Sequence, residues 1–142
     1  MIVSSERNFI ATRRRRFTVQ GIKSRHRARA ARIAPGDRLC WYVTGRAVFA
    51  ATATVRSPVF VGRERIWISD GKPDPYPWRV RIAKDAAVPP RRGVPAGSLR
   101  GRLRFVKRRE PHWTLAFQGN LHELVAADFA LIERAVRSAM SP

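Results

Sequence analysis

The chain has 142 residues, which is the size of one ordinary domain and too few for two independent cores. Lysine and arginine total 29 against 10 acidic residues, a net charge of +19, so a polyanion is the expected partner. No stretch approaches the ~18 apolar residues of a membrane span, and the apolar start Met1–Val3 is too short for a signal peptide. We therefore predict a single domain, residues 1–142, that is cytoplasmic and has no membrane partner.

The positive charge is concentrated near the N-terminus. The first 34 residues hold ten basic residues and one acid, Glu6, whereas residues 110–142 hold two arginines against four acids. This asymmetry predicts that the N-terminal part carries the binding surface. An alternative remains open, because 25 of the 29 basic residues are arginine, as a GC-rich coding sequence would also produce.

The first half of the chain contains a predicted helix and several strands. Ser24 can cap a short basic helix that runs to Ile33 and is ended by Pro35 and Gly36. Residues 38–44 and 46–55 are rich in β-branched and aromatic side chains on either side of Gly45, which predicts a β-hairpin with Gly45 in its turn. Residues 66–68 and 78–82 are read as strands that flank a proline-rich loop.

The second half contains less regular structure until its end. Residues 98–103 are read as one or two helical turns, and residues 112–122 form an aromatic segment with a polar tip. A helix is predicted from Ala126 to Ala139 because apolar residues recur at helical spacing, and its buried stripe is expected to hold Phe129, Ile132, Val136 and Met140. The pattern is typical of an α+β fold with a small, strongly curved sheet or barrel.

The sequence offers no set of residues typical of an active site. Its three histidines have no partner at metal-ligand spacing, its glycines are dispersed rather than gathered in a phosphate-binding loop, and no GxSxG motif occurs. The single cysteine, Cys40, lies in an apolar run and is read as a buried structural thiol. We therefore predict a binding module rather than an enzyme, with no catalytic residue, no metal and no cofactor.

Four blocks of sequence carry a family resemblance: FTVQGIKSRH at 17–26, PGDRL at 35–39, YPWRV at 76–80 and HWTLAFQGNL at 112–121. In this order and spacing they resemble the EVE domain family of the PUA-like superfamily, which also holds the YTH domains. The resemblance covers nearly the whole chain. It implies a PUA-like pseudo-barrel of mostly antiparallel strands with flanking helices, and a pocket that accepts a single, often modified, base flipped from DNA or RNA.

The resemblance also suggests where such a pocket lies. YTH domains hold methylated adenine in a cage of tryptophans, and residues 17–21 and the stretch around Trp67 resemble its walls. The chain departs from the EVE pattern in two places, since it opens at Met1–Ser4 without an aromatic–tryptophan pair and has Gln20 where many members carry tryptophan.

The candidate pocket residues are aromatic and polar side chains within or near the four blocks. Each aromatic face that stacks on a flipped base contributes roughly 1–3 kcal/mol, and polar groups must supply selectivity at the base edge. Trp41 and Tyr42 face opposite sides of their strand, and Tyr42 is preferred because its hydroxyl can reach a base. The predicted base pocket comprises Ser4, Ser5, Asn8, Phe17, Gln20, Tyr42, Trp67, Tyr76, Gln118 and Asn120.

Phosphate contacts are expected from the basic residues of the N-terminal third. The predicted phosphate-binding residues are Arg13, Arg14, Arg15, Arg16, Lys23, Arg25, His26 and Arg27, and a possible second strip comprises Arg104, Lys107, Arg108 and Arg109.

The function predicted from the sequence is a nucleic-acid-binding module that holds one flipped, often modified, base in an aromatic and polar pocket beside a basic rim. An alternative is a nonspecific basic RNA-binding or ribosome-associated module without a working pocket, and a third, less supported, is an enzyme that acts on a base or small molecule. The choice between DNA and RNA, the modification and the oligomeric state stay open.

Overall fold

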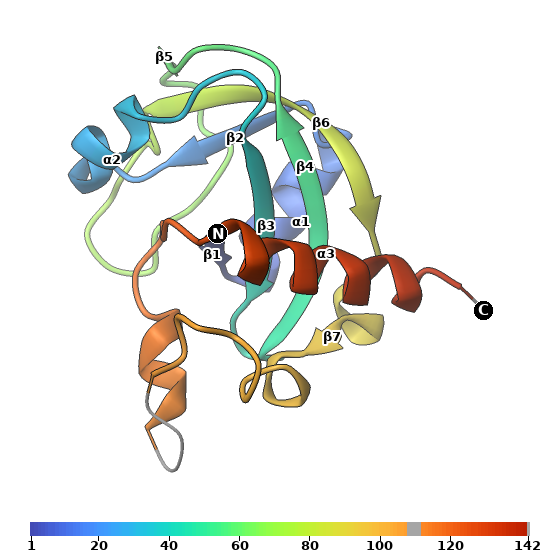
Figure 1. Cartoon of the computed structure of the whole chain (residues 1–142). Helices are drawn as coiled ribbons and strands as arrows, with labels where there is room; N and C mark the ends of the chain where they lie inside the picture. Colours follow the sequence, from blue (N-terminus) through green and yellow to red (C-terminus); the bar gives the residue numbers. More distant parts are fainter. Residues whose placement is uncertain (108–111, 142) are drawn as a thin grey trace.

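The computed structural model describes residues 1–107 and 112–141, and the fold is mixed α+β (Figure 1). Its strands are β1 (Ile2–Ser4), β2 (Val19–Ile22), β3 (Arg38–Val43), β4 (Val48–Val55), β5 (Phe60–Val61), β6 (Trp78–Ala87) and β7 (Val94–Pro95). Its helices are α1 (Glu6–Arg14), α2 (Arg27–Ala31) and α3 (Ala126–Ala139), with short 3-10 turns η1 (Ser24–His26), η2 (Pro90–Arg92), η3 (Ala96–Ser98) and η4 (Trp113–Phe117).

The strands of the described residues form one curled sheet with the central order β1-β3-β4-β6-β2, while β5 pairs with β6 and β7 with β4. Every pairing is antiparallel except that of β1 with β3. Bulges place one extra residue in β4, Ala50 opposite Trp41 and Tyr42, and one in β6, Asp85 opposite Thr52 and Ala53, and such bulges bend and twist a sheet. The curled, mostly antiparallel sheet with flanking helices confirms the predicted α+β pseudo-barrel class.

Several predicted elements are present. The hairpin of β3 and β4 is confirmed, with Gly45 in its turn at a φ of 79°. The helix predicted at the C-terminal end is α3, with the predicted bounds. Met140 is nevertheless 47% exposed, so its place on the buried stripe was wrong, because the helix ends one residue earlier and Met140 is its C-cap.

Other predictions were wrong in ways that have physical causes. Residues 66–68 form no strand, because they belong to an irregular loop whose Ile66 and Trp67 pack with Val19 of β2 and Ala11 of α1. The predicted helix from Ser24 to Ile33 is divided into η1 and α2, and of residues 98–103 only Ser98, the end of η3, is in a helical turn. Helix α1 is not among the predicted elements, although Ser5 caps it by accepting from the Asn8 backbone N–H at 3.1 Å.

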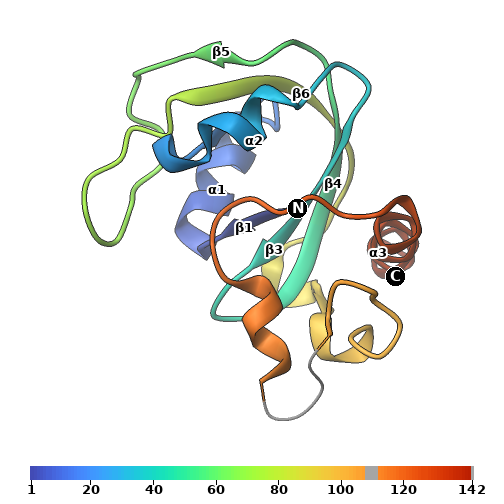
Figure 2. The same ribbon diagram turned by 60° about the vertical axis from the view of Figure 1, so that its left-hand side comes forward.

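The core has two large clusters, one on each face of the sheet, and a third, smaller cluster of Val19, Trp67 and Tyr76. Figures 1 and 2 show α1 within the curl of the sheet and α3 on its outer face. Adjacent residues of β3 serve the two sides, because Trp41 packs in the inner cluster with Phe9 of α1 and Tyr42 packs in the outer cluster with Ile132 of α3. Within the described residues, no helix is long and apolar enough to cross a bilayer.

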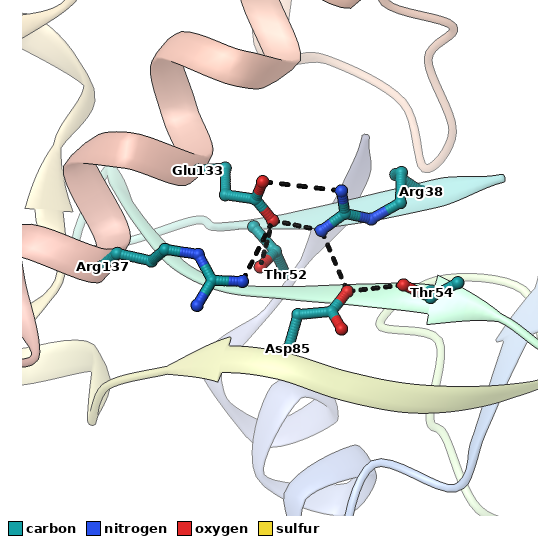
Figure 3. Close-up of polar contacts among 6 residues, drawn as sticks. All are labelled: Arg38, Thr52, Thr54, Asp85, Glu133 and Arg137. Carbon is teal, nitrogen blue, oxygen red and sulfur yellow. Dashed lines mark hydrogen bonds and ion pairs between the residues drawn. The ribbon is translucent and has the colours of Figure 1, made fainter. Parts of the chain in front are cut away.

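A network of charged and hydroxyl groups fixes α3 to the outer face (Figure 3). Glu133 of α3 forms an ion pair with Arg38 of β3 and accepts a hydrogen bond from Thr52 of β4 at 3.3 Å. Arg38 also contacts Asp85 of β6 at 3.0 Å. Because these groups come from three adjacent strands and the helix, they fix the position of α3 over the sheet in addition to its apolar stripe.

We expect Glu133→Gln to lower the free energy of unfolding by about 1–2 kcal/mol, because Arg38 and Thr52 lose a charged acceptor. Urea denaturation followed by circular dichroism measures this change. Arg134→Gln, on the same helix but exposed, is the control and should change the stability by less than about 0.5 kcal/mol. Equal effects of both substitutions would contradict the stabilising role of the network.

Candidate functional site

A cavity of about 200 Å³ lies at the N-terminal end of α1. Strand β1, the end of β2, residues 67–76 and the segment at Gly119 and Asn120 meet around it. We call it the Trp67 cavity. The sequence-predicted pocket residues that line it are Ser4, Ser5, Asn8, Gln20, Trp67, Tyr76 and Asn120. Its volume corresponds to about seven water molecules at ~30 Å³ each, which is the scale of one ring system.

Two aromatic side chains, Trp67 and Tyr76, form walls of the cavity. Their ring centroids lie 6.1 Å apart at an interplanar angle of 48°. Tyr76 has a φ of 52°, in the left-handed region, which costs roughly 1–3 kcal/mol in a bulky residue and must be compensated by its surroundings. Its backbone N–H donates to Asp74 at 2.8 Å, and its hydroxyl accepts from Asn8 at 3.3 Å.

The Tyr76 hydroxyl is a neutral hydrogen-bond donor at physiological pH. Burial raises its pKa above the ordinary value, and the carboxylates of Asp74 and Asp70 raise it further. Because its oxygen already accepts from Asn8, its proton is the group it can offer to a molecule in the cavity.

Trp67 is fixed from several directions. Its indole N–H donates to the Thr12 hydroxyl at 2.9 Å, and the Arg79 guanidinium lies 5.1 Å from its ring centroid. Gly21 lies against its ring so closely that a Cβ there would come within 2.4 Å of Cζ3. Trp67 reaches this position because β2 offers a residue without a side chain at the contact.

Gln20 connects the cavity to the inner core. Its side-chain oxygen accepts from the Thr12 hydroxyl at 2.8 Å and from the Trp41 indole at 2.9 Å, and Thr12 in turn accepts from Trp67. Gln20 is 4% exposed. The Gln20 side chain therefore positions Trp67 through Thr12, and it contributes to the cavity as a support rather than as an open polar group.

The other two amides of the cavity are also engaged within the protein. The Asn8 side chain donates to the Ile68 carbonyl and accepts from the Ile68 N–H, both at 2.9 Å. The Asn120 side chain accepts from the Lys23 N–H at 3.1 Å and donates to the Val3 carbonyl at 3.3 Å. These amides hold the walls together, so polar contacts with a bound molecule fall mainly to hydroxyl groups and to other cavity residues.

Three sequence-predicted pocket residues lie away from the Trp67 cavity. Phe17 is in the inner core, with its ring centroid 5.7 Å from those of Phe9 and Trp41. Tyr42 lies on the opposite side of the sheet and stacks on Phe117 at 4.2 Å, because the alternation of β3 directs it toward α3. Gln118 is exposed at the end of η4.

Sequence reasoning missed several residues that line the cavity. They are Ile2 and Val3 of β1, Thr44 in the β3–β4 turn, Ile68, Asp70 and Gly71 after Trp67, and Gly119. Asp70 lies in the proline-rich loop between the two predicted strands, and its position shortly after Trp67 is the one sequence signal that points to it. The described residues contain no cluster of three or more histidine, cysteine or acidic side chains that could hold a metal ion.

Four basic residues follow β2 in sequence, namely Lys23, Arg25, His26 and Arg27, and of these Lys23 lines the cavity. The Lys23 ammonium lines the cavity and lies 5.8 Å from the centroid of the Tyr76 ring. Arg27 lies 5.6 Å from the Trp78 ring. Burial, and secondly the charge of Arg25, lower the pKa of the His26 imidazole.

The predicted phosphate contacts Arg13–Arg16 lie at the other end of α1 and form a second basic group. Arg15 forms an ion pair with Glu64 at 2.7 Å. Arg13 and Arg16 border an open hollow of about 460 Å³, which we call the basic hollow, and it is lined by Arg13, Arg16, Phe17, Lys84, Ala87, Val88 and Pro89. The eight predicted phosphate contacts are thus divided between two places.

The possible second basic strip is only partly visible. Arg104 and Lys107 are exposed, and the Arg104 backbone N–H donates to Asp128 at 2.9 Å. Arg108 and Arg109 lie outside the described residues.

We expect Gly21→Ala to lower the free energy of unfolding by about 1–3 kcal/mol, because the added Cβ overlaps the Trp67 ring and the Tyr76 carbonyl. Urea denaturation followed by tryptophan fluorescence reports both the stability and the environment of Trp67. Gly101→Ala is the control, since nothing lies within 4 Å of a Cβ there. An unchanged midpoint and emission spectrum in Gly21→Ala would contradict the close contact.

Comparisons with known proteins give a likeness of fold. No protein-family model matches the chain, and no curated protein matches it. Among solved structures, the chain is similar to Rpa0253 from Rhodopseudomonas palustris, a structural genomics target determined by NMR. The TM-score is 0.60 at 13% sequence identity, over 96% of this chain and 92% of that one. At this identity the chain and Rpa0253 are similar in their overall fold.

Proposed function

We propose that this protein is a cytoplasmic EVE-like, PUA-like nucleic-acid-binding module that holds one unpaired base, often a modified one, in the Trp67 cavity and does not catalyse a reaction. The observation that carries the proposal is the pair of aromatic walls, Trp67 and Tyr76, around a space of about 200 Å³ with the Lys23 ammonium beside it. This volume is below the ~300 Å³ at which drug-sized ligand sites begin, so one ring system suits it.

The energetics of base insertion are compatible with these walls. A flipped base loses a few kcal/mol of stacking and pairing, and contact with an aromatic side chain returns roughly 1–3 kcal/mol per ring. The Tyr76 and Ser5 hydroxyls supply hydrogen-bond donors, since each of their oxygens already accepts from the protein. Selectivity would then come from these donors and from the Asp70 carboxylate.

The charge distribution supports a nucleic acid over a neutral ligand. Lys23 lines the cavity, and Arg25 and Arg27 follow it in η1 and α2, so these side chains are proposed to contact the phosphates that flank an inserted base. The net charge of +19 adds long-range attraction to any polyanion.

A nonspecific basic module is the second candidate. It is favoured by the burial of Trp67, which is 2% exposed, and by the internal engagement of all three cavity amides. The two candidates differ in one property, because nonspecific binding through phosphates ignores the identity of the base.

The decisive experiment measures fluorescence anisotropy with matched DNA and RNA oligonucleotides at near-physiological salt. Each carries one variable position that is abasic, unmodified, N6-methyladenine, 5-methylcytosine or 5-hydroxymethylcytosine. We expect a preference of at least about tenfold, or ~1.4 kcal/mol, for one base over the abasic position. Equal affinities that disappear together as salt rises would favour the nonspecific module.

The chain offers a matched pair of variants for this experiment, because its two tyrosines lie on opposite sides of the sheet. Tyr76→Phe removes the hydroxyl in the cavity and should weaken binding of the preferred oligonucleotide by about threefold to tenfold. Tyr42→Phe removes a hydroxyl far from the cavity and should leave the affinity unchanged. Equal losses in both variants would count against the cavity.

The lowered pKa of His26 predicts that binding depends on pH. Burial is the largest cause, and the charges of neighbouring residues add to it, namely Arg25, Arg29, His122 and Lys23. These effects disfavour the imidazolium cation in the free protein and hold the pKa of His26 below its ordinary value of 6.5. A bound phosphate favours the cation, so complex formation takes up a proton and the affinity should rise as pH falls from 7.5 to 5.5.

Anisotropy titrations across this range check the dependence. His26→Gln should flatten it, whereas His112→Gln, at an exposed histidine before η4, should preserve it. An affinity in the unsubstituted protein that does not change with pH would contradict a phosphate contact at His26.

A further inference from the structure

The solvent-exposed face of α1 carries cations that have no acidic partner among the described residues. Residues 8, 9 and 12 of the helix are buried and Ile10 is half-buried, so the exposed arc holds Arg7, Arg13 and Arg14. Of the other charged residues nearby, Glu6 pairs with Arg46 and Arg15 with Glu64. The remaining arginines are therefore free to meet anions from outside the protein.

The Trp67 cavity and the basic hollow lie at opposite ends of α1. Ser5 and Asn8, at its start, line the Trp67 cavity, while Arg13 and Arg16, at its end, border the basic hollow. The chain leaves α1 through two left-handed residues, Arg16 with a φ of 57° and Phe17 with a φ of 53°, and both line the hollow.

The basic hollow combines cations with apolar surface. Arg13 and Arg16 come from the end of α1, and Lys84 comes from β6, so charges of two separate elements converge on it. Ala87, Val88 and Pro89 supply an apolar floor. A phosphate group suits the cations, and the face of a sugar or base suits the floor, so the chemistry matches a nucleotide.

We propose that the solvent-exposed face of α1 binds a single strand of nucleic acid. The strand follows this face as a track from the Trp67 cavity to a nucleotide subsite in the basic hollow. This inference rests on the proposed function, because the cavity fixes where the strand starts. A single strand is favoured over a duplex because the apolar floor needs a base or sugar face that duplex stacking covers, and because one helix presents a surface only about 10 Å wide.

The length of the track sets the footprint. The nine residues of α1 span ~13 Å at 1.5 Å per residue. A stacked strand advances ~3.4 Å per nucleotide, so about four nucleotides separate the base in the cavity from the one in the hollow. Nucleotides added on one side of the inserted base should therefore make new contacts with the protein up to about the fourth nucleotide, and none beyond it.

The test uses fluorescein-labelled single-stranded DNA and RNA that carry the preferred base of the panel, extended by one to eight nucleotides on either its 5′ or its 3′ side. We expect the affinity to rise with extension on one side only and to reach a plateau at about four or five added nucleotides. An affinity that does not depend on length, or that rises equally on both sides without a plateau, would overturn the track.

The variant Arg13→Gln/Lys84→Gln removes two cations of the hollow at positions of ordinary helix and strand backbone. We expect it to weaken long oligonucleotides by about tenfold, to leave unextended ones unchanged, and to make the log–log salt slope shallower by about 1.4. Arg102→Gln/Arg134→Gln removes the same charge from an exposed turn and from α3. Equal effects of the two double variants at every length would overturn the subsite.

Two further measurements distinguish a loss of binding from a loss of stability, and the track from the cavity. Arginines in the last turn of a helix also stabilise it through the helix dipole, so denaturation midpoints are measured for each variant, and binding is compared only among folded proteins. Replacing the preferred base with an abasic position tests the proposed function alone. Length dependence without base dependence would contradict the cavity as the start of the strand and support only strand binding at the basic hollow. Tighter binding of an equally long duplex would overturn the single-strand assignment.

Discussion

The buried amide of Gln20 is the interaction on which the candidate site depends. Its oxygen accepts from Trp41 of β3 and from Thr12 of α1, and Thr12 accepts from Trp67 of the long loop. Helix α1, strands β2 and β3 and the loop before β6 are thereby joined at one point. In this low-dielectric interior each of these polar groups would be costly to leave unpaired, so the network permits one arrangement of helix, sheet and loop.

The irregular loop before β6 keeps its shape through polar contacts rather than through strand pairing. Asn8 binds both backbone groups of Ile68, and Asp74 accepts from the backbone N–H groups of Ser24 and Tyr76. These contacts compensate the left-handed backbone at Tyr76. A loop that is fixed at both ends in this way can present two aromatic rings to a small cavity without being a regular element.

The sheet separates the cavity side of the protein from the side of α3. Figure 3 shows that Glu133, Arg38 and Asp85 meet on the outer face, while the Gln20 network lies on the inner face. Tyr42 and Trp41 illustrate the consequence, because neighbouring residues of one strand belong to different clusters. Substitutions beneath α3 are therefore expected to change the stability of the fold. Substitutions around Trp67 are expected to change both the stability and the binding of a molecule in the cavity.

Local sequence signals were enough to predict the fold class, the β3–β4 hairpin, helix α3 and seven of the fifteen residues that line the Trp67 cavity, since periodicity and turn residues are read over short stretches of chain. The sequence could not show that Phe17 and Tyr42 are core residues, that Gln20 supports Trp67, or that Lys84 joins Arg13 and Arg16. The physical reason is that these relations depend on which strands pair and where they bulge. Contacts between residues far apart in the chain leave no trace in local spacing.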